Sequence, residues 1–135
     1  MTGGQARSGG REVVVLAVVL DCADLARSGA FWSDALGYVA EPLSSGRYRR
    51  LLPPDGEGVE LLLQRVPEPK TQKNRMHLDL RVPDLEAEVA RMLSLGARCV
   101  TESPVEEDGW AWHVLADPDG NEFCVLRPPA TATAP

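Results

Sequence analysis

The fold is decided by the stretch HLDLRVPDL at residues 77–85, which the chain repeats in outline. Sixty positions earlier, residues 17–25 read AVVLDCADL, again a strand-like run that ends in Asp-Leu where a helix is expected to begin. Each copy then passes a Leu-Gly pair and a Pro-Asp-Gly turn before it ends in an apolar strand. The repeat predicts two similar halves packed against each other, with a ligand cleft between or within them.

Length and composition favour a soluble protein. The chain has 135 residues, of which 44% are hydrophobic and 25% charged, as in ordinary globular proteins. It has no apolar run near the roughly 20 residues that span a bilayer, and residues 1–10 are too polar for a secretory signal. The net charge of −6 argues against nucleic acid as a partner. Three cysteines without zinc-like spacing are expected to be free thiols in the cytoplasm.

The repeat divides the chain as follows. We expect a flexible head at 1–11, one domain at 12–128 and a disordered tail at 129–135. The domain contains two βαβββ repeats, at about 12–67 and 75–128. The expected fold class is α+β, with two curved mixed sheets around a central chamber and helices outside.

Each repeat has one helix with recognisable ends. Asp24 and Asp84 are predicted N-caps, and Gly37 and Gly96 are predicted C-terminal caps. The predicted elements of the first copy are strands at 13–20, near 39, at 48–52 and at 59–66, with a helix at 25–36. Those of the second copy are strands at 75–82, 97–101, 110–115 and 121–127, with a helix that begins at 85.

Polar residues alternate with apolar ones along the strand at 75–82. One face carries Met76, Leu78, Leu80 and Val82, and the other carries Arg75, His77, Asp79 and Arg81. Asp79 is placed to orient the His77 imidazole or to keep it charged. The polar face points either to water, with His77 an ordinary hydrogen-bonded side chain, or into the chamber.

Two tryptophans form a second pattern of interest. Trp110 and Trp112 share one face of a predicted strand, with His113 on the other. Two such indoles form either a platform for a flat or cationic ligand, or a pair in the core or at a dimer interface. Trp32 lies on the apolar side of the first helix and is expected in the core.

The closing strands of the two copies carry further candidates. Glu122 and Cys124 lie in the last strand, and Glu60 lies in its earlier counterpart. Matching the Pro-Asp-Gly turns aligns Glu60 with Cys124, and matching Gly58 with Gly120 instead aligns Leu62 with Cys124. The two registers differ by an even number, so they predict the same faces.

Together these residues resemble the vicinal oxygen chelate superfamily, also called the glyoxalase/bleomycin-resistance/dioxygenase fold. The resemblance covers about residues 13–127, and the segments 74–80 and 121–124 look most like its glyoxalase-like subgroup. It implies a homodimer and a chamber that, in the enzymes of the superfamily, holds one divalent metal ion.

The metal ligands of those enzymes are a His on the first strand of each copy and a Glu on the last strand of one or both. Carried over, these positions are Ala17, Glu60, His77 and Cys124, so one ligand is lost and one has become a thiol. A Glu/His/Cys set suits zinc and matches poorly the oxygen-rich sites of nickel, iron or manganese. We therefore expect no cofactor, with a divalent ion held by Glu60, His77 and Cys124 as the alternative.

The resemblance leaves three functions open. The first is a metal-independent small-molecule binder or orphan enzyme, similar to the bleomycin-resistance proteins that sequester a cationic drug. Its predicted binding residues are Glu60, His77, Asp79, Trp110, Trp112 and Cys124. In this first function His77, oriented by Asp79, is a hydrogen-bond donor or base. The second is a metal-dependent lyase, isomerase or dioxygenase, in which Glu60, His77 and Cys124 hold the ion and Glu122 is a nearby acid or base. The third is a structural or interaction module.

Overall fold

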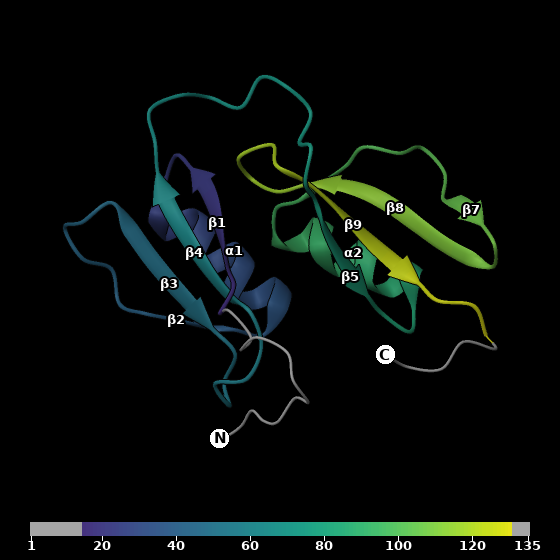
Figure 1. Ribbon diagram of the computed structural model, residues 1–135. Helices are drawn as coiled ribbons and strands as arrows, with labels where there is room; N and C mark the ends of the chain where they lie inside the picture. Colours follow the sequence, from purple (N-terminus) through teal and green to yellow (C-terminus); the bar gives the residue numbers. More distant parts are fainter. Residues whose placement is uncertain (1–14, 131–135) are drawn as a thin grey trace, which may run out of the picture.

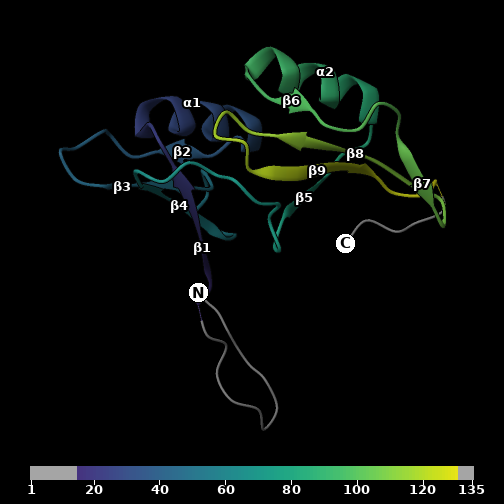
Figure 2. The same cartoon turned by 90° about the horizontal axis from the view of Figure 1, so that it is seen from above.

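The computed structural model describes residues 15–130, so the predicted head and most of the predicted tail lie outside the described residues. Two mixed sheets and two helices confirm the α+β prediction. The sheets lie side by side, with one helix packed behind each (Figure 1). Both helices cover the same side of the pair of sheets (Figure 2), so the opposite faces are left for a site.

The first module corresponds to the first sequence copy. Its sheet has the order β1-β4-β3-β2, in which β1 and β4 are parallel and the other neighbours antiparallel. Its elements are β1 (Ala17–Cys22), α1 (Leu25–Leu36), β2 (Val39–Ala40), β3 (Tyr48–Leu52) and β4 (Glu60–Arg65). The bounds of α1 and β3 are as predicted, whereas β1 continues to Cys22 because its pairing with β4 continues that far.

The second module repeats this plan with the order β5-β9-β8-β6. Its elements are β5 (Leu78–Arg81), α2 (Leu85–Leu95), β6 (Arg98–Cys99), β7 (Val105–Glu107), β8 (Trp110–Ala116) and β9 (Glu122–Arg127). β7 was not predicted. It forms a hairpin with β8 through Asp108 and Gly109, whose φ angles of 54° and 85° are typical of a tight hairpin turn.

Both helices end at the predicted capping residues. The Asp24 carboxylate accepts from the amides of Ala26 and Arg27 at 2.9 and 3.1 Å, and these bonds lower the pKa of Asp24. Gly37 follows α1 with a φ of 73°, a conformation that favours glycine. Asp84 and Gly96 have the same roles in α2. Each copy of the repeat therefore contains the residues that begin and end its helix.

An aromatic cluster joins the modules into one core. Phe31 and Trp32 project from α1, and Phe123 projects from β9 of the other module. The three ring centroids lie 5.0 to 6.0 Å apart in edge-to-face arrangements. Trp32 is 1% exposed, so its predicted place in the core is confirmed.

The loop between β8 and β9, residues 117–121, holds the second module against the first. We call the hydrogen bonds between Asp119 and the start of α1 the clasp. Its Asp119 carboxylate accepts from the backbone amide of Ala23 at 2.8 Å, from Arg27 Nη2 at 3.1 Å and from the hydroxyl of Ser28. All three donors lie at the start of α1 or just before it. The Asp119 carboxylate therefore joins the two modules of this chain.

A second carboxylate of this loop is buried beneath the clasp. Asp117 is 4% exposed and accepts from Trp32 Nε1 at 2.9 Å. The backbone amides of Asp119 and Asn121 donate to it at 2.9 and 2.8 Å. Burial raises the pKa of Asp117, and these hydrogen bonds oppose that shift. A buried carboxylate with this many donors fixes the loop shape rather than facing a ligand.

Candidate functional site

A pocket of about 310 Å³ opens on the second sheet, among the side chains that alternate with those of the core. We call it the second-module pocket. It brings together residues of β5, β8 and β9 with two residues of the segment that precedes β5. The lining residues are Lys73, His77, Asp79, Trp112, Val114, Glu122, Cys124 and Leu126.

Three potential metal ligands converge in this pocket. His77 Nδ1 lies 3.1 Å from Asp79 Oδ1 and 3.9 Å from Cys124 Sγ. The backbone explains the convergence, because Asp79 of β5 lies directly opposite Cys124 of β9 in the parallel ladder. His77 immediately precedes β5 and places its ring beside both side chains.

The environment of Cys124 keeps its thiol protonated. The residue is 7% exposed. Burial, followed by the nearby Asp79 carboxylate, raises the pKa of Cys124 to about 11. Both effects disfavour the thiolate. The thiol is therefore neutral at physiological pH, and a cation beside it would reverse that preference.

Glu122 lines the same pocket but is held by other groups. Its Oε1 accepts from the backbone amide of Asn74 at 2.9 Å and lies 3.1 Å from Lys70 Nζ. The Asn74 amide is the main cause of a lowered pKa of Glu122. The ionised Glu122 carboxylate therefore connects the segment between β4 and β5 to β9. Because it stays ionised, it is a poor proton donor.

The two tryptophans of β8 have different neighbours. Trp112 lines the second-module pocket. Trp110 lies under the guanidinium of Arg81, whose Cζ is 5.2 Å from the ring centroid, a cation–π contact. His113 belongs to the opposite face, where its Nδ1 lies 2.7 Å from Thr101 Oγ1. Of the two histidines, His77 is thus the one at the pocket.

Strand pairing also decides between the two sequence registers. In the first module Val19 lies opposite Leu62, and in the second Asp79 lies opposite Cys124. Val19 and Asp79 occupy the same place in the repeat, five residues before the N-cap of each helix. Leu62 is therefore the counterpart of Cys124. This corrects the register that aligned Glu60 with Cys124 and leaves the faces as predicted.

Glu60 lies on the first module, away from this group. Its carboxylate accepts from Arg50 Nε at 2.9 Å and from Nη2 at 3.3 Å. Arg50 also forms an ion pair with Glu41 at 3.3 Å. The charge of Glu60 is thus balanced within its own sheet.

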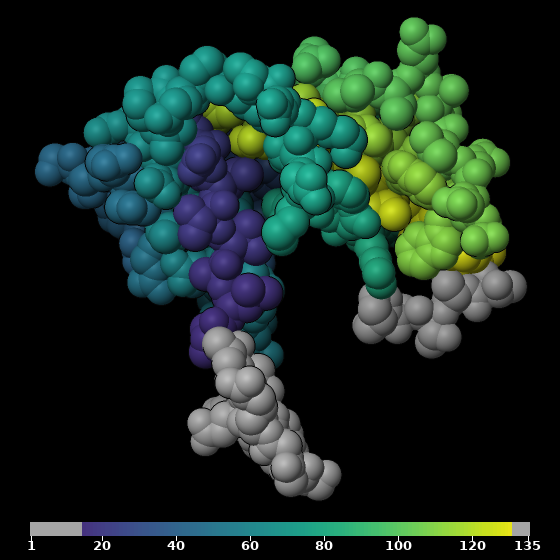
Figure 3. Space-filling model, turned by 45° about the horizontal axis from the view of Figure 1, so that its top comes forward, coloured from purple at the N-terminus to yellow at the C-terminus, as the bar shows by residue number. Residues whose placement is uncertain are grey.

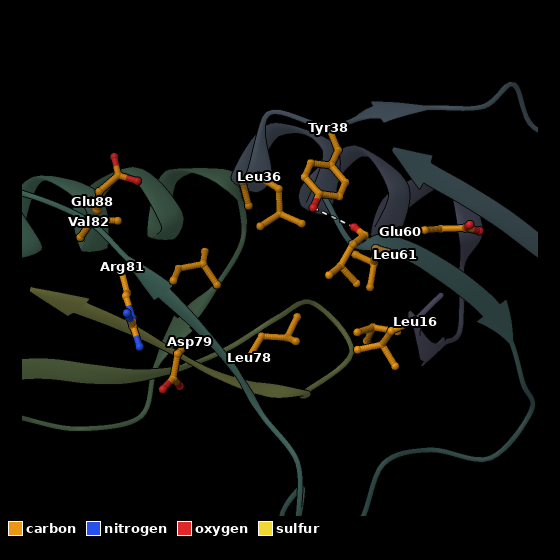
Figure 4. A pocket seen from close by; sticks show the side chains of 14 residues that line it. Leu16, Leu36, Tyr38, Glu60, Leu61, Leu78, Asp79, Arg81, Val82 and Glu88 are labelled. Carbon is orange, nitrogen blue, oxygen red and sulfur yellow. Dashed lines mark hydrogen bonds between the residues drawn. The ribbon is translucent and has the colours of Figure 1, made fainter. Parts of the chain in front are cut away.

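A larger cavity, of about 470 Å³, lies between the modules. The surface is hollowed between the two halves of the molecule (Figure 3). The cavity has apolar walls that include Leu36, Leu61 and Leu78, and the hydroxyl of Tyr38 donates to the Val59 carbonyl at 2.8 Å beside it (Figure 4). Figure 4 also shows the Glu60 carboxylate pointing away from its centre. The repeat predicts a cleft between the two halves, and two of the predicted binding residues, Glu60 and Asp79, are among the residues that line this cavity.

The potential metal ligands of the structure can be compared with the metal site that the resemblance implies. Ala17 has no donor atom, and Glu60 is paired with Arg50. In the described part of the chain, the potential ligands that lie within 4.8 Å of one another are His77, Asp79 and Cys124. These three fit a divalent ion with nitrogen, oxygen and sulfur ligands, whereas the four-residue set carried over from the resemblance does not.

Two mixed sheets with both helices on one side are the architecture of the glyoxalase/bleomycin-resistance/dioxygenase class of proteins. Residues 17–126 match a family described as a glyoxalase-like domain. The chain belongs to that family.

Solved structures with the same fold have little sequence similarity to this chain. A glyoxalase/bleomycin resistance protein/dioxygenase family enzyme from Burkholderia phytofirmans is 19% identical, with a TM-score of 0.67 over 82% of this chain and 95% of that one. The fosfomycin resistance protein FosX from Listeria monocytogenes is 15% identical, with a TM-score of 0.68 over 84% and 89%. That structure contains Mn(II) and a dihydroxypropylphosphonic acid. At these identities the likeness shows the fold alone.

No protein of curated function matches the sequence. Among the residues that the structure describes, no helix is long and apolar enough to cross a membrane.

Proposed function

We propose that this protein binds a small molecule in the second-module pocket, either to sequester it, as a bleomycin-resistance protein does, or to transform it. The observation that carries the proposal is the convergence of His77, Asp79 and Cys124 beside the indole of Trp112. Such a pocket offers a flat apolar wall together with a few polar groups that can fix a ligand's orientation. His77, oriented by Asp79, is the proposed donor or base.

Glu122 and Glu60 take lesser parts in this proposal. The charged Glu122 carboxylate would form part of the pocket wall instead of transferring a proton. Glu60 and Trp110 would contact only a ligand that extends beyond the second-module pocket. The three free cysteines in the described part of the chain suit a reducing cytoplasm.

A ligand screen with paired histidine variants tests the proposal. Metal-free bleomycin and a library of small aromatic amines and acids would be screened by ligand-observed NMR. We expect the bound compounds to lose at least about tenfold in affinity in His77→Ala and Trp112→Ala, because each change removes a pocket contact. His113→Ala is the matched control, since His113 lies on the opposite face. Compounds whose binding is unchanged in both pocket variants would contradict the proposal.

The second candidate is a metal-dependent lyase, isomerase or dioxygenase. The grouping of His77, Asp79 and Cys124 favours it, because these residues fit a divalent ion. A bound ion would supply Lewis-acid polarisation of a ligand oxygen. Metal analysis of the purified protein, before and after chelation and in His77→Ala, separates the two candidates. Stoichiometric metal that disappears in His77→Ala would favour the second.

We also propose that the protein is a homodimer. Leu16 and Met76 are 68% and 84% exposed and line the gap between β1 and β5. Burial of such side chains against a second copy is favourable. Light scattering should give twice the mass of the chain. The mass of a single chain at micromolar concentration would contradict this proposal.

A further inference from the structure

The three donors of the second-module pocket surround one point instead of forming a relay. Asp79 Oδ1 and Cys124 Sγ both approach the same ring nitrogen, Nδ1 of His77, at 3.1 and 3.9 Å. In a nucleophilic Cys-His-Asp triad the thiol and the carboxylate contact different ring nitrogens, so that one orients the ring while the other exchanges a proton. Three donors around one point are instead typical of the ligands of a single ion.

We propose that the second module alone holds a thiophilic divalent ion, with the properties of zinc, through His77, Asp79 and Cys124. On binding, the thiol of Cys124 would release its proton to water as the sulfur–metal bond forms, and the three protein ligands would leave a fourth position of the ion for water or a ligand. Nitrogen, oxygen and sulfur ligands together favour zinc over magnesium or manganese. No residue of the first module is required.

The distances allow such a site after small side-chain movements. Ligand atoms about 2.0 to 2.3 Å from a tetrahedral zinc ion lie roughly 3.3 to 3.8 Å from one another. The three donor atoms here lie within 4.8 Å of one another. The His77 and Asp79 side chains are 42% and 44% exposed, so they have room to rotate. The buried Cys124 is the fixed member of the set.

The proposal deepens the second candidate function by naming the ligand residues and the class of metal ion. It rests on that function only for the chemistry that the bound ion would supply. It also changes the ligand set expected from the sequence. Asp79 replaces Glu60, because Asp79 lies opposite Cys124 in the strand ladder and Glu60 is paired with Arg50. The site is therefore built on two adjacent strands of one sheet.

Cobalt(II) titration of the full chain tests the proposal without an enzyme assay, because thiolate-bound cobalt gives a sulfur-to-metal charge-transfer band. We expect one equivalent of cobalt to produce the band, and zinc to abolish it by displacement. Cys124→Ser should abolish the band. His77→Ala and Asp79→Asn should each weaken binding at least about tenfold, because each removes one ligand. Circular dichroism would confirm that each variant remains folded.

Two further variants serve as controls. Cys99→Ser is matched to Cys124→Ser, since Cys99 Sγ also lies beside a histidine, at 3.5 Å from His113 Nδ1, and it should keep the band. Glu60→Gln should keep the affinity. A folded protein without the band, or a band that is lost in Cys99→Ser and kept in Cys124→Ser, would overturn the proposal. A tenfold loss in Glu60→Gln would overturn the single-module site.

Failure of this site is distinguishable from failure of the proposed function. If cobalt does not bind but small molecules still bind with His77 dependence, the metal site is wrong and the ligand pocket stands. If cobalt binds as described and no small molecule depends on His77 or Trp112, the metal site stands and the ligand pocket is wrong.

Discussion

At the scale of single residues, the chemistry of Cys124 is set first by burial and then by Asp79, its neighbour across the ladder. Alternation in the sequence placed His77 and Asp79 on one face of their strand, and Cys124 on one face of the last strand. It did not show that Cys124 lies directly opposite Asp79. Alternation fixes a register only up to an even number of residues, so faces are predictable from sequence while cross-strand partners are not.

We predict that Cys124 reacts slowly with neutral alkylating reagents at pH 8. The thiolate is the reactive form, and a pKa of about 11 leaves little of it at that pH. In a Cys22→Ser/Cys99→Ser variant, the rate of iodoacetamide labelling, followed by mass spectrometry, should rise with pH towards a midpoint near that value.

Asp79→Asn tests the cause of this shift. Removing a negative charge near the thiol favours the thiolate, so the midpoint should move to lower pH and the rate at pH 8 should rise. An unchanged midpoint in a folded variant would show that burial alone raises the pKa of Cys124.

A second prediction at this scale concerns Trp32. Trp32→Phe removes the donor to the buried Asp117 carboxylate, and should lower the free energy of unfolding by about 1 to 3 kcal/mol. Urea denaturation would measure the loss. Trp110→Phe makes the same change at a half-buried position and should cost less. Equal losses in the two variants would contradict the structural role of the Trp32–Asp117 bond.

At the scale of elements, identical motifs have different roles in the two copies. Both copies carry Pro-Asp-Gly. In the first copy Asp55 accepts from the amide of Glu57 in an exposed turn, whereas in the second Asp119 holds the start of α1. The helix ends were predictable because capping is local. The clasp was not, because it depends on how the modules pack. β7 was not predictable from alternation, because its three residues, Val105–Glu107, are all exposed and show no apolar pattern.

The two turns give a matched pair of variants. Asp119→Ala leaves several donors near α1 without their acceptor and should lower the free energy of unfolding by about 1 to 3 kcal/mol. Asp55→Ala should cost clearly less, because water replaces its single exposed hydrogen bond. Urea denaturation of both variants compares them directly. A larger loss in Asp55→Ala would contradict the clasp.

At the scale of the whole molecule, the repeat predicted the architecture. It did not predict which of the two modules carries the group of potential metal ligands. The two sheets have the same plan, yet the described ligand group belongs to the second module. The first copy has Ala17 and Leu62 where the second has His77 and Cys124. The two modules therefore keep the same plan of strands and helix, while the described group of potential ligands lies in the second module.

The most direct test of this account is a crystal structure of the full chain grown with zinc and recorded at the zinc absorption edge. We predict one anomalous peak in the second-module pocket, within about 2.0 to 2.3 Å of a His77 ring nitrogen, an Asp79 oxygen and Cys124 Sγ. A structure in which the side chains of His77 and Cys124 face opposite surfaces, with no shared peak between them, would contradict it.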